Sequence, residues 1–288
     1  MNINTYRFDG KGGISLDDYR TDDTGGYTKE SSRELLQQNI ERMATLQDTL
    51  YAQNIHAMLI IIQAMDAAGK DSLVKHVMSG LNPQGVHVTS FKQPSAEELD
   101  HDYMWRAMRA MPERGRIGIF NRSYYEEVLV VRVHPELLNR QQLPPVTNHS
   151  ALWKQRFNDI CSIEQYLENN SIHVVKLFLH VSKDEQKKRF MERINDPAKN
   201  WKFSAADISE RGFWDEYQNA YTEMIEHTST KHAPWYILPA DNKWFTRLLA
   251  SEIIIQRLNQ LNLQYPVLSN EQKKVLEESQ RQLQTEYK

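Results

Sequence analysis

Residues 58–72 read MLIIIQAMDAAGKDS, an apolar run followed by a turn of small residues that ends in Gly69 and Lys70. A short, continuous apolar run bounded by such a turn indicates a strand that is buried on both faces. After the turn, apolar residues recur at helical spacing as far as Met78. The stretch therefore predicts a strand, a loop and a helix in immediate succession.

The turn has the shape of a Walker A phosphate loop and stands in the strand-to-helix context that this motif requires. Small residues let backbone N–H groups converge on phosphate oxygens, and the start of the following helix adds partial positive charge. Two positions depart from the motif, because Ala64 replaces the opening glycine and Asp71 replaces the usual hydroxyl residue. The alternative is a plain turn that only joins a strand to a helix. The residues predicted to bind phosphate here are Ala67, Ala68, Gly69, Lys70, Asp71 and Ser72.

Similar apolar runs, separated by helix-like sequence, cover residues 86–91, 117–120, 174–181 and 235–238. Alternation of strands and helices predicts an α/β fold with a mainly parallel sheet and helices on both faces. Together with the phosphate loop, the pattern predicts a three-layer α/β/α P-loop fold.

The segments outside these runs are polar. Residues 1–29 show no sustained period and are predicted to form an extended arm. Ser31 and Glu34 have the spacing of a capping box, which predicts the start of a helix that continues to residue 54. Residues 134–150 contain three prolines and predict a loop, whereas residues 270–288 predict a helix on the surface or against a partner.

We therefore divide the chain into three parts. An N-terminal arm and helix would cover residues 1–54, the P-loop core residues 55–265, and a helical tail residues 266–288. Within the core, a helical lid is expected over about 182–215.

Composition restricts the function. The formal net charge of −3 argues against a general nucleic-acid or membrane-surface binder, so any polyanion must meet a local basic patch. Cys161 is the only cysteine, which excludes an intrachain disulfide and a Cys-rich metal site and favours a reducing cytoplasm. No apolar run approaches the roughly 20 residues of a membrane helix, and residues 1–10 lack the pattern of a signal peptide.

A second motif follows the apolar run 117–120 and reads NRSYYEE over residues 121–127. Ligands of open α/β sheets bind beyond the carboxyl ends of the strands. Arg122 is therefore expected to point toward the same crevice as the phosphate loop.

Ser182 and Glu185 form another capping-box pattern and open a helix that should stop near Pro197. Spacings of three and four place Gln186, Arg189 and Arg193 along one face of it. A basic ridge of this kind suits a lid that clamps phosphates, although an ordinary solvated surface helix has the same pattern. Further cations follow it at Lys199, Lys202 and Arg211.

Taken together, these motifs resemble the polyphosphate kinase 2 family. The stretches that carry the resemblance are Asp66 to Asp71, Asn82 to Gly85, Phe91-Lys92 with Pro94, Asn121 to Glu126, Lys188 to Phe190, Arg193, Pro197, Trp201 to Phe203 and Ala233 to Trp235. Several separated motifs in the right order are far more specific than a single Walker A sequence.

The resemblance implies Mg²⁺-dependent, reversible transfer of a phosphoryl group between inorganic polyphosphate and ADP, with AMP or guanine nucleotides as further candidate substrates. It also implies a homo-oligomer. Asp66, Lys70 and Arg122 would be the catalytic residues, and Asn121 and Glu126 would belong to the site. Asp66 is the metal candidate, because a bare carboxylate beside phosphates otherwise repels them, and a turn or capping role is its alternative. Candidate phosphate ligands outside the loop are Lys92, Arg106, Arg132, Arg189, Arg193, Lys202 and Arg211.

Two other functions remain open from the sequence. An ATP-dependent nucleoside monophosphate kinase would have a similar core and lid. A regulatory module could bind nucleotide through the altered loop without turnover, which the departures at Ala64 and Asp71 would permit.

Overall fold

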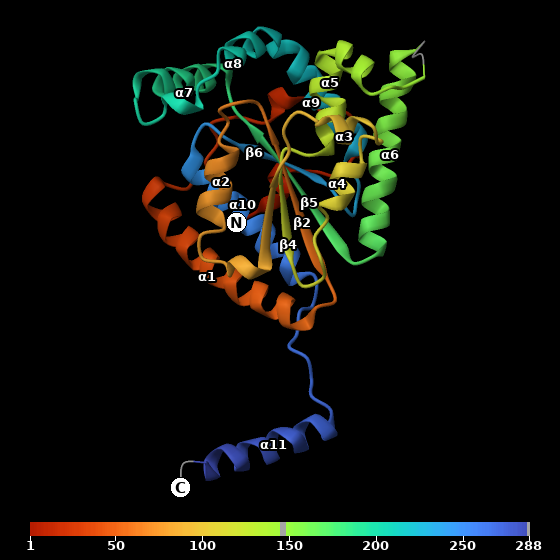
Figure 1. The fold of residues 1–288 in the computed structure, drawn as a ribbon. Helices are drawn as coiled ribbons and strands as arrows, with labels where there is room; N and C mark the ends of the chain where they lie inside the picture. The colour runs from red at the N-terminus through yellow and green to blue at the C-terminus, as the bar shows by residue number, and fades with distance from the viewer. Residues whose placement is uncertain (145–147, 287–288) are drawn as a thin grey trace.

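The structure, a computed structural model, describes residues 1–144 and 148–286, and within them one sheet runs in the order β1-β6-β5-β2-β4-β3 (Figure 1). The short edge strand β1 is antiparallel to β6, and the other pairings are parallel. The strands are β1 (Arg7–Phe8), β2 (Ala57–Ala64), β3 (Val86–Ser90), β4 (Ile117–Asn121), β5 (Ile172–His180) and β6 (Trp235–Pro239). All five predicted strands and the mainly parallel sheet are confirmed.

Strand β2 lies at the centre of the sheet, and every one of its residues is buried. Ile60 stands opposite Ile119 of β4 and Val175 of β5, so apolar side chains form layers across the sheet. The continuous apolar run exists because helices cover both faces of this strand. Burial of β2 thereby fixes the position of the loop that follows it.

Helices cover the sheet on both faces, as the alternating pattern predicts (Figure 1). On one face lie α1 (Lys29–Gln53), α2 (Lys70–Val77) and α10 (Lys243–Asn259); on the other lie α5 (Val130–Val133), α6 (His149–Asn169) and α9 (Trp214–Thr228). Helices α7 (Lys183–Asn195) and α8 (Ala205–Glu210) lie beyond the carboxyl ends of the strands. The remaining elements are α3 (Ala96–Leu99), α4 (Trp105–Arg109), α11 (Asn270–Thr285) and the 3₁₀ turns η1 (Ile3–Tyr6), η2 (Leu16–Asp18), η3 (Pro83–Gly85), η4 (Tyr124–Val128), η5 (Pro135–Arg140), η6 (Asn200–Lys202) and η7 (Arg211–Phe213).

The prediction of an extended arm for residues 1–29 is wrong in part. The segment forms η1, β1 and η2, and it buries Tyr6, Phe8 and Leu16 in the core. The Tyr6 hydroxyl also donates a hydrogen bond to Asp23 at 2.6 Å. Isolated apolar residues without a period carry too little signal to show that they pack against a distant strand.

The predicted capping box at Ser31 and Glu34 is also wrong, because α1 begins at Lys29. Thr28 is the N-cap: its hydroxyl accepts from the Ser31 N–H at 3.2 Å, and the Ser31 hydroxyl accepts from the Thr28 N–H at 3.1 Å. Here Ser31 takes the position that the motif usually gives to an acid. The Ser182 cap of α7 is confirmed, since its hydroxyl accepts from the Glu185 N–H at 3.1 Å.

The loop predicted over residues 134–150 is only partly a loop. It contains η5, and α6 begins at His149, capped by Asn148. Pro135 opens η5, a position where its fixed φ and missing N–H cost nothing. Pro145 lies outside the described residues.

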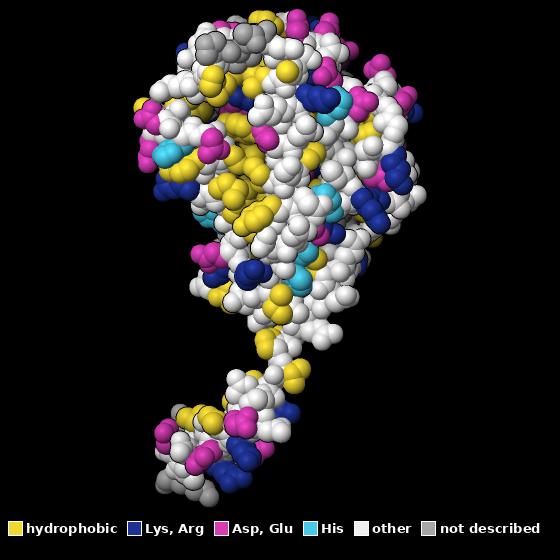
Figure 2. All heavy atoms as spheres, turned by 90° about the vertical axis from the view of Figure 1, so that its right-hand side faces the viewer, with side chains coloured by type: hydrophobic (Ala, Val, Ile, Leu, Met, Phe, Trp, Pro, Cys, Tyr) yellow, Lys and Arg dark blue, Asp and Glu magenta, His cyan; other side chains and the backbone are white. Residues whose placement is uncertain are grey.

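The C-terminal tail is helical, as predicted. Helix α11 buries none of its residues and stands clear of the core in Figures 1 and 2. Apolar side chains are exposed on it and on the segment before it, including Val267, Val275 and Leu283. Its contact with a partner, and the homo-oligomer, stay predictions. In the described ranges, no helix is long and apolar enough to cross a membrane.

Candidate functional site

The loop between β2 and α2 has the backbone of an anion-binding turn. Ala67 has a φ of 60° and Gly69 a φ of 117°, and the latter value requires a residue without a Cβ. Gly69 is also the N-cap of α2 and supplies no side-chain cap, so N–H groups of the first helical turn are available to a ligand.

Lys70, the first residue of α2, folds back onto the loop. Its Nζ donates to the carbonyl oxygens of Ala64 at 2.8 Å and Met65 at 3.3 Å, and lies 3.9 Å from Asp66 Oδ1. Burial, helped by the nearby Arg122, lowers the pKa of Lys70 to about 8 against the opposing effect of Asp66. This cation is therefore held at the loop in a poorly solvated position.

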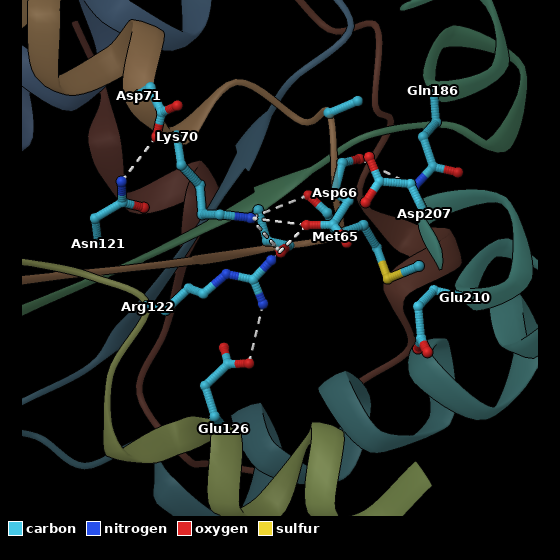
Figure 3. A network of polar contacts seen from close by, with 12 residues as sticks. Met65, Asp66, Lys70, Asp71, Asn121, Arg122, Glu126, Gln186, Asp207 and Glu210 are labelled. Carbon is cyan, nitrogen blue, oxygen red and sulfur yellow. Dashed lines mark hydrogen bonds and ion pairs between the residues drawn. The ribbon is translucent and has the colours of Figure 1, made fainter. Parts of the chain in front are cut away.

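Arg122 follows β4 and joins two carboxylates (Figure 3). Its Nη2 donates to Asp66 Oδ1 at 2.5 Å, and its Nη1 donates to Glu126 Oε2 at 3.1 Å. Glu126 has the largest effect on the pKa of Arg122 and raises it above its ordinary value. Asp66 adds to this rise, whereas burial opposes it. Burial acts to raise the pKa of Asp66, but Lys70, Arg122 and the more distant Arg193 outweigh it and lower that pKa. The prediction that Arg122 points toward the phosphate loop is confirmed. The backbone of Arg122 has a φ of 64°.

A cavity of about 620 Å³ opens over the loop and extends to α7 and η6. Its lining is strongly basic, with eight cationic side chains against three acidic ones. The cations are Lys70, Lys92, Arg122, Arg189, Arg193, Lys199, Lys202 and Lys243, and the acids are Asp66, Asp71 and Glu192. Such an imbalance suits a ligand that carries several negative charges.

Many of the predicted site residues line this cavity, although their chemical roles stay predictions. Asn121 at the end of β4 donates its Nδ2 to Asp71 Oδ1 at 2.8 Å, so two of the unusual positions contact each other. The predicted residues in the lining are Asp66, Ala67, Gly69, Lys70, Asp71, Ser72, Lys92, Asn121, Arg122, Arg189, Arg193 and Lys202.

Four predicted phosphate ligands do not line the cavity, and the three arginines among them are held by other partners. Arg106 donates to the carbonyl of Lys92 at 2.7 Å, and Arg132 pairs with Glu223 at 2.5 Å. Arg211 donates to a backbone carbonyl and a glutamine side chain of α7. Ala68 is buried below the loop, and Glu126 contacts the site through Arg122.

Gln186 and Arg189 of α7 are both buried, so the alternative of a solvated surface helix is wrong at these two positions. Gln186 donates to the carbonyl of Asp66 at 3.0 Å. Arg189 donates to Glu185 at 2.8 Å and to four carbonyls: Ala67 at 3.1 Å, Ala68 at 2.6 Å, Ala240 at 2.6 Å and Asp241 at 3.0 Å. The carbonyls of a tight loop have no helix or sheet partner, and Arg189 satisfies them. Helical spacing cannot distinguish such a clamp from a solvated ridge.

We predict that Arg189→Ala lowers the free energy of unfolding by about 3 kcal/mol, because it leaves buried carbonyls and a carboxylate unsatisfied. Lys188→Ala is the matched control, because this substitution removes the same charge from the same helix. The side chain of Lys188 is 68% exposed. Urea denaturation followed by circular dichroism measures both. Equal stability of the two variants would contradict the clamp.

Two residues that sequence reasoning missed lie at the site. Lys243 lines the cavity at the start of α10. It follows the end of β6 by four residues, so the rule that strand ends carry ligands would have identified it. Asp207 of α8 pairs with Arg193 at 3.4 Å and lies near Asp66 (Figure 3). Burial foremost, and then Asp66, raises the pKa of Asp207.

The carboxylates of the site fit a metal that substrate helps to hold. Within the described ranges, no cluster of three or more His, Cys, Asp or Glu side chains could hold a metal by itself. Mg²⁺ usually binds one or two carboxylates and completes its shell with phosphate oxygens and water. Asp66, with Asp207 as a second carboxylate, has the composition for this arrangement.

Two curated proteins are similar to the chain along most of its length. An ADP-polyphosphate phosphotransferase of Rhodopseudomonas palustris is 51% identical over 257 residues, which covers 89% of each chain. An AMP/ADP-polyphosphate phosphotransferase of Meiothermus ruber is 41% identical over 263 residues, covering 91% of this chain and 94% of the relative.

The crystal structure of polyphosphate kinase 2 from Arthrobacter aurescens superposes with a TM-score of 0.85 at 37% identity, covering 94% of both chains. The family model for polyphosphate kinase 2 matches residues 26–266, which include the loop, Arg122 and helices α7 and α8. The chain therefore belongs to the polyphosphate kinase 2 family.

Proposed function

We propose that this protein transfers a phosphoryl group reversibly between inorganic polyphosphate and ADP, with AMP and guanine nucleotides as further candidate substrates. The observation that carries the proposal is the cavity whose eight cations converge on the loop of Lys70. Relatives named for ADP and for AMP/ADP phosphotransfer support the choice of nucleotide.

Phosphoryl transfer requires positioning of the reacting groups and neutralisation of the phosphate oxygens, with little covalent chemistry from the protein. We assign neutralisation to Lys70 and Arg122, because Lys70 begins α2 after the loop that follows β2 and Arg122 directly follows β4. In the structure both cations pair with Asp66. Entering phosphate would compete for them and release the carboxylate for a metal.

We propose Mg²⁺ as the cofactor, held by Asp66 together with phosphate oxygens, with Asp207 as a second carboxylate of the site. The metal would supply Lewis-acid stabilisation of the developing charge when bound. Arg193, which pairs with Asp207, and Lys202 would hold phosphates farther from the reacting centre. A cytoplasmic location is also part of the proposal, since the chain carries a single cysteine.

The test is incubation of the full chain with ADP, Mg²⁺ and polyphosphate as the only phosphoryl donor. We expect ATP to appear by ion-exchange chromatography and to be absent when EDTA is added. Absence of ATP with short and long polyphosphate alike, in folded protein, would contradict the proposal.

Repeating the assay without polyphosphate separates the two rival functions, because a nucleoside monophosphate kinase would still form ATP and AMP from two ADP molecules. An ATP-dependent nucleoside monophosphate kinase would convert AMP and ATP to ADP and ignore polyphosphate. A regulatory module would turn over neither donor above background. Family membership favours neither rival.

A further inference from the structure

Arg247 of α10 is a half-buried cation with unusual surroundings. Its Nη2 donates to Ser72 Oγ at 2.7 Å, on helix α2 that follows the phosphate loop. Its Nε is buried without a hydrogen-bond partner, and no carboxylate lies within ion-pair distance of it in the described part of the chain. A cation that loses water without gaining an acid is destabilising unless an anion binds beside it.

Lys243 connects Arg247 to the main cavity. It stands four residues before Arg247 on α10, so the two side chains share a face of the helix. A small recess beside the main cavity is lined by both, and it shares Gly69, Ser72 and Lys243 with that cavity. Burial first, and then the nearby Arg189 and Arg247, lower the pKa of Lys243, so these cations lie close enough to repel one another.

The basic surface continues on α2. Ser72, Lys75 and His76 are three and four residues apart and share one face of that helix. Besides burial, Arg247 and Lys75 lower the pKa of His76, which places these groups near each other. Figure 1 shows α2 and α10 side by side, and the two helices contact each other. Positive charge therefore extends from the loop onto the outer surface.

We propose that Lys243, Arg247 and Lys75, here called the outer basic row, bind the distal phosphates of a long polyphosphate chain whose end lies at the Lys70 loop. The inference rests on the proposed function and adds to it a site that favours long polyphosphate over short polyphosphate. A linear polyphosphate repeats its charge at every unit, so it can occupy the loop and the row together. A nucleobase would need an apolar slot, which a row of cations does not offer.

Lys75→Gln and Arg247→Gln test the row, with Lys274→Gln on the distant helix α11 as a control for net charge. The measured quantity is the KM for long polyphosphate divided by the KM for tripolyphosphate, which we expect to occupy the loop and to end before Arg247 and Lys75. Loss of one charge-assisted contact should raise this ratio about tenfold for Arg247→Gln, and about threefold for the more exposed Lys75→Gln. The control should leave the ratio at the wild-type value.

Salt supplies a second readout. Each lost phosphate contact should reduce the slope of log affinity for long polyphosphate against log salt by something under about one. Arg247→Gln loses the hydrogen bond to Ser72, which could disturb the loop. Lys75 is exposed, so Lys75→Gln should fold normally and tests the row independently.

The outcomes distinguish this inference from the proposed function. An unchanged KM ratio in both variants would contradict the proposal that the outer basic row binds polyphosphate. An equal rise of both KM values would also overturn it, because Arg247 would then only support the loop through Ser72. If wild-type protein makes no ATP from polyphosphate of any length, the proposed function itself fails.

Discussion

Lys70→Ala is expected to lower kcat/KM for phosphoryl transfer by about 10²- to 10³-fold. The charge that develops on the transferring group loses a fixed cation in a poorly solvated site, and removal of one such donor typically costs about 3 kcal/mol of transition-state stabilisation. The side chain of Lys70 is only 10% exposed, so bulk water cannot replace it well. Initial rates at saturating and limiting polyphosphate measure the effect.

Thermal unfolding is the control for this variant, because Lys70 also donates to the carbonyls of Ala64 and Met65. Lys187→Ala removes the same charge from an exposed position on α7 and should keep wild-type kinetics. A Lys70→Ala rate within about fivefold of wild type, in folded protein, would mean that the loop only joins β2 to α2.

The pH dependence of the wild-type enzyme should report the same residue. With a pKa of about 8 in the folded protein, Lys70 carries its proton below pH 8 and loses it as the pH rises. The kcat/KM, which reflects the free enzyme, should therefore fall about tenfold per pH unit above 8, and Lys70→Ala should lack this limb. A wild-type profile flat to about pH 10 would contradict the low pKa.

The strands and the loop could be predicted because their signal is local. Burial of β2 on both faces demands a continuous apolar run, and a phosphate loop demands small residues and a lysine in a fixed order. The meeting of Arg122 with Asp66 was also predictable, since both follow parallel strands that are neighbours in the sheet.

Other features depend on contacts between distant segments, which spacing does not encode. Arg189 is a cation on a polar helix, and only the packing of α7 on the loop turns it toward four carbonyls. Tyr6 and Phe8 lie in a polar segment, yet they pack on a strand more than 200 residues later in the chain. Asp207 lies near Asp66 because α8 folds over the sheet, and no motif marks it.

Asp66→Asn is expected to lower activity by at least about 10²-fold and to remove the response of the residual rate to Mg²⁺. The substitution keeps the size of the side chain and removes only the charge, and a neutral amide is a poor ligand for Mg²⁺ beside phosphates. In the free protein it also weakens two ion pairs, with Arg122 at 2.5 Å and Lys70 at 3.9 Å. Denaturant unfolding should therefore accompany the Mg²⁺ titration.

Asn121→Asp is the matched control at the end of the neighbouring strand. It brings a carboxylate toward Asp71, to which the Asn121 amide now donates at 2.8 Å, so a loss of a few-fold from like-charge repulsion is expected. If Asp66→Asn instead follows the wild-type Mg²⁺ titration, Asp66 does not hold the metal. Glu127 could not take over the role, because its side chain is 3% exposed and paired with Arg156 at 3.2 Å. Glu126, which pairs with Arg122, and Asp207 would then be the next candidates, and their amide variants should lose the Mg²⁺ response.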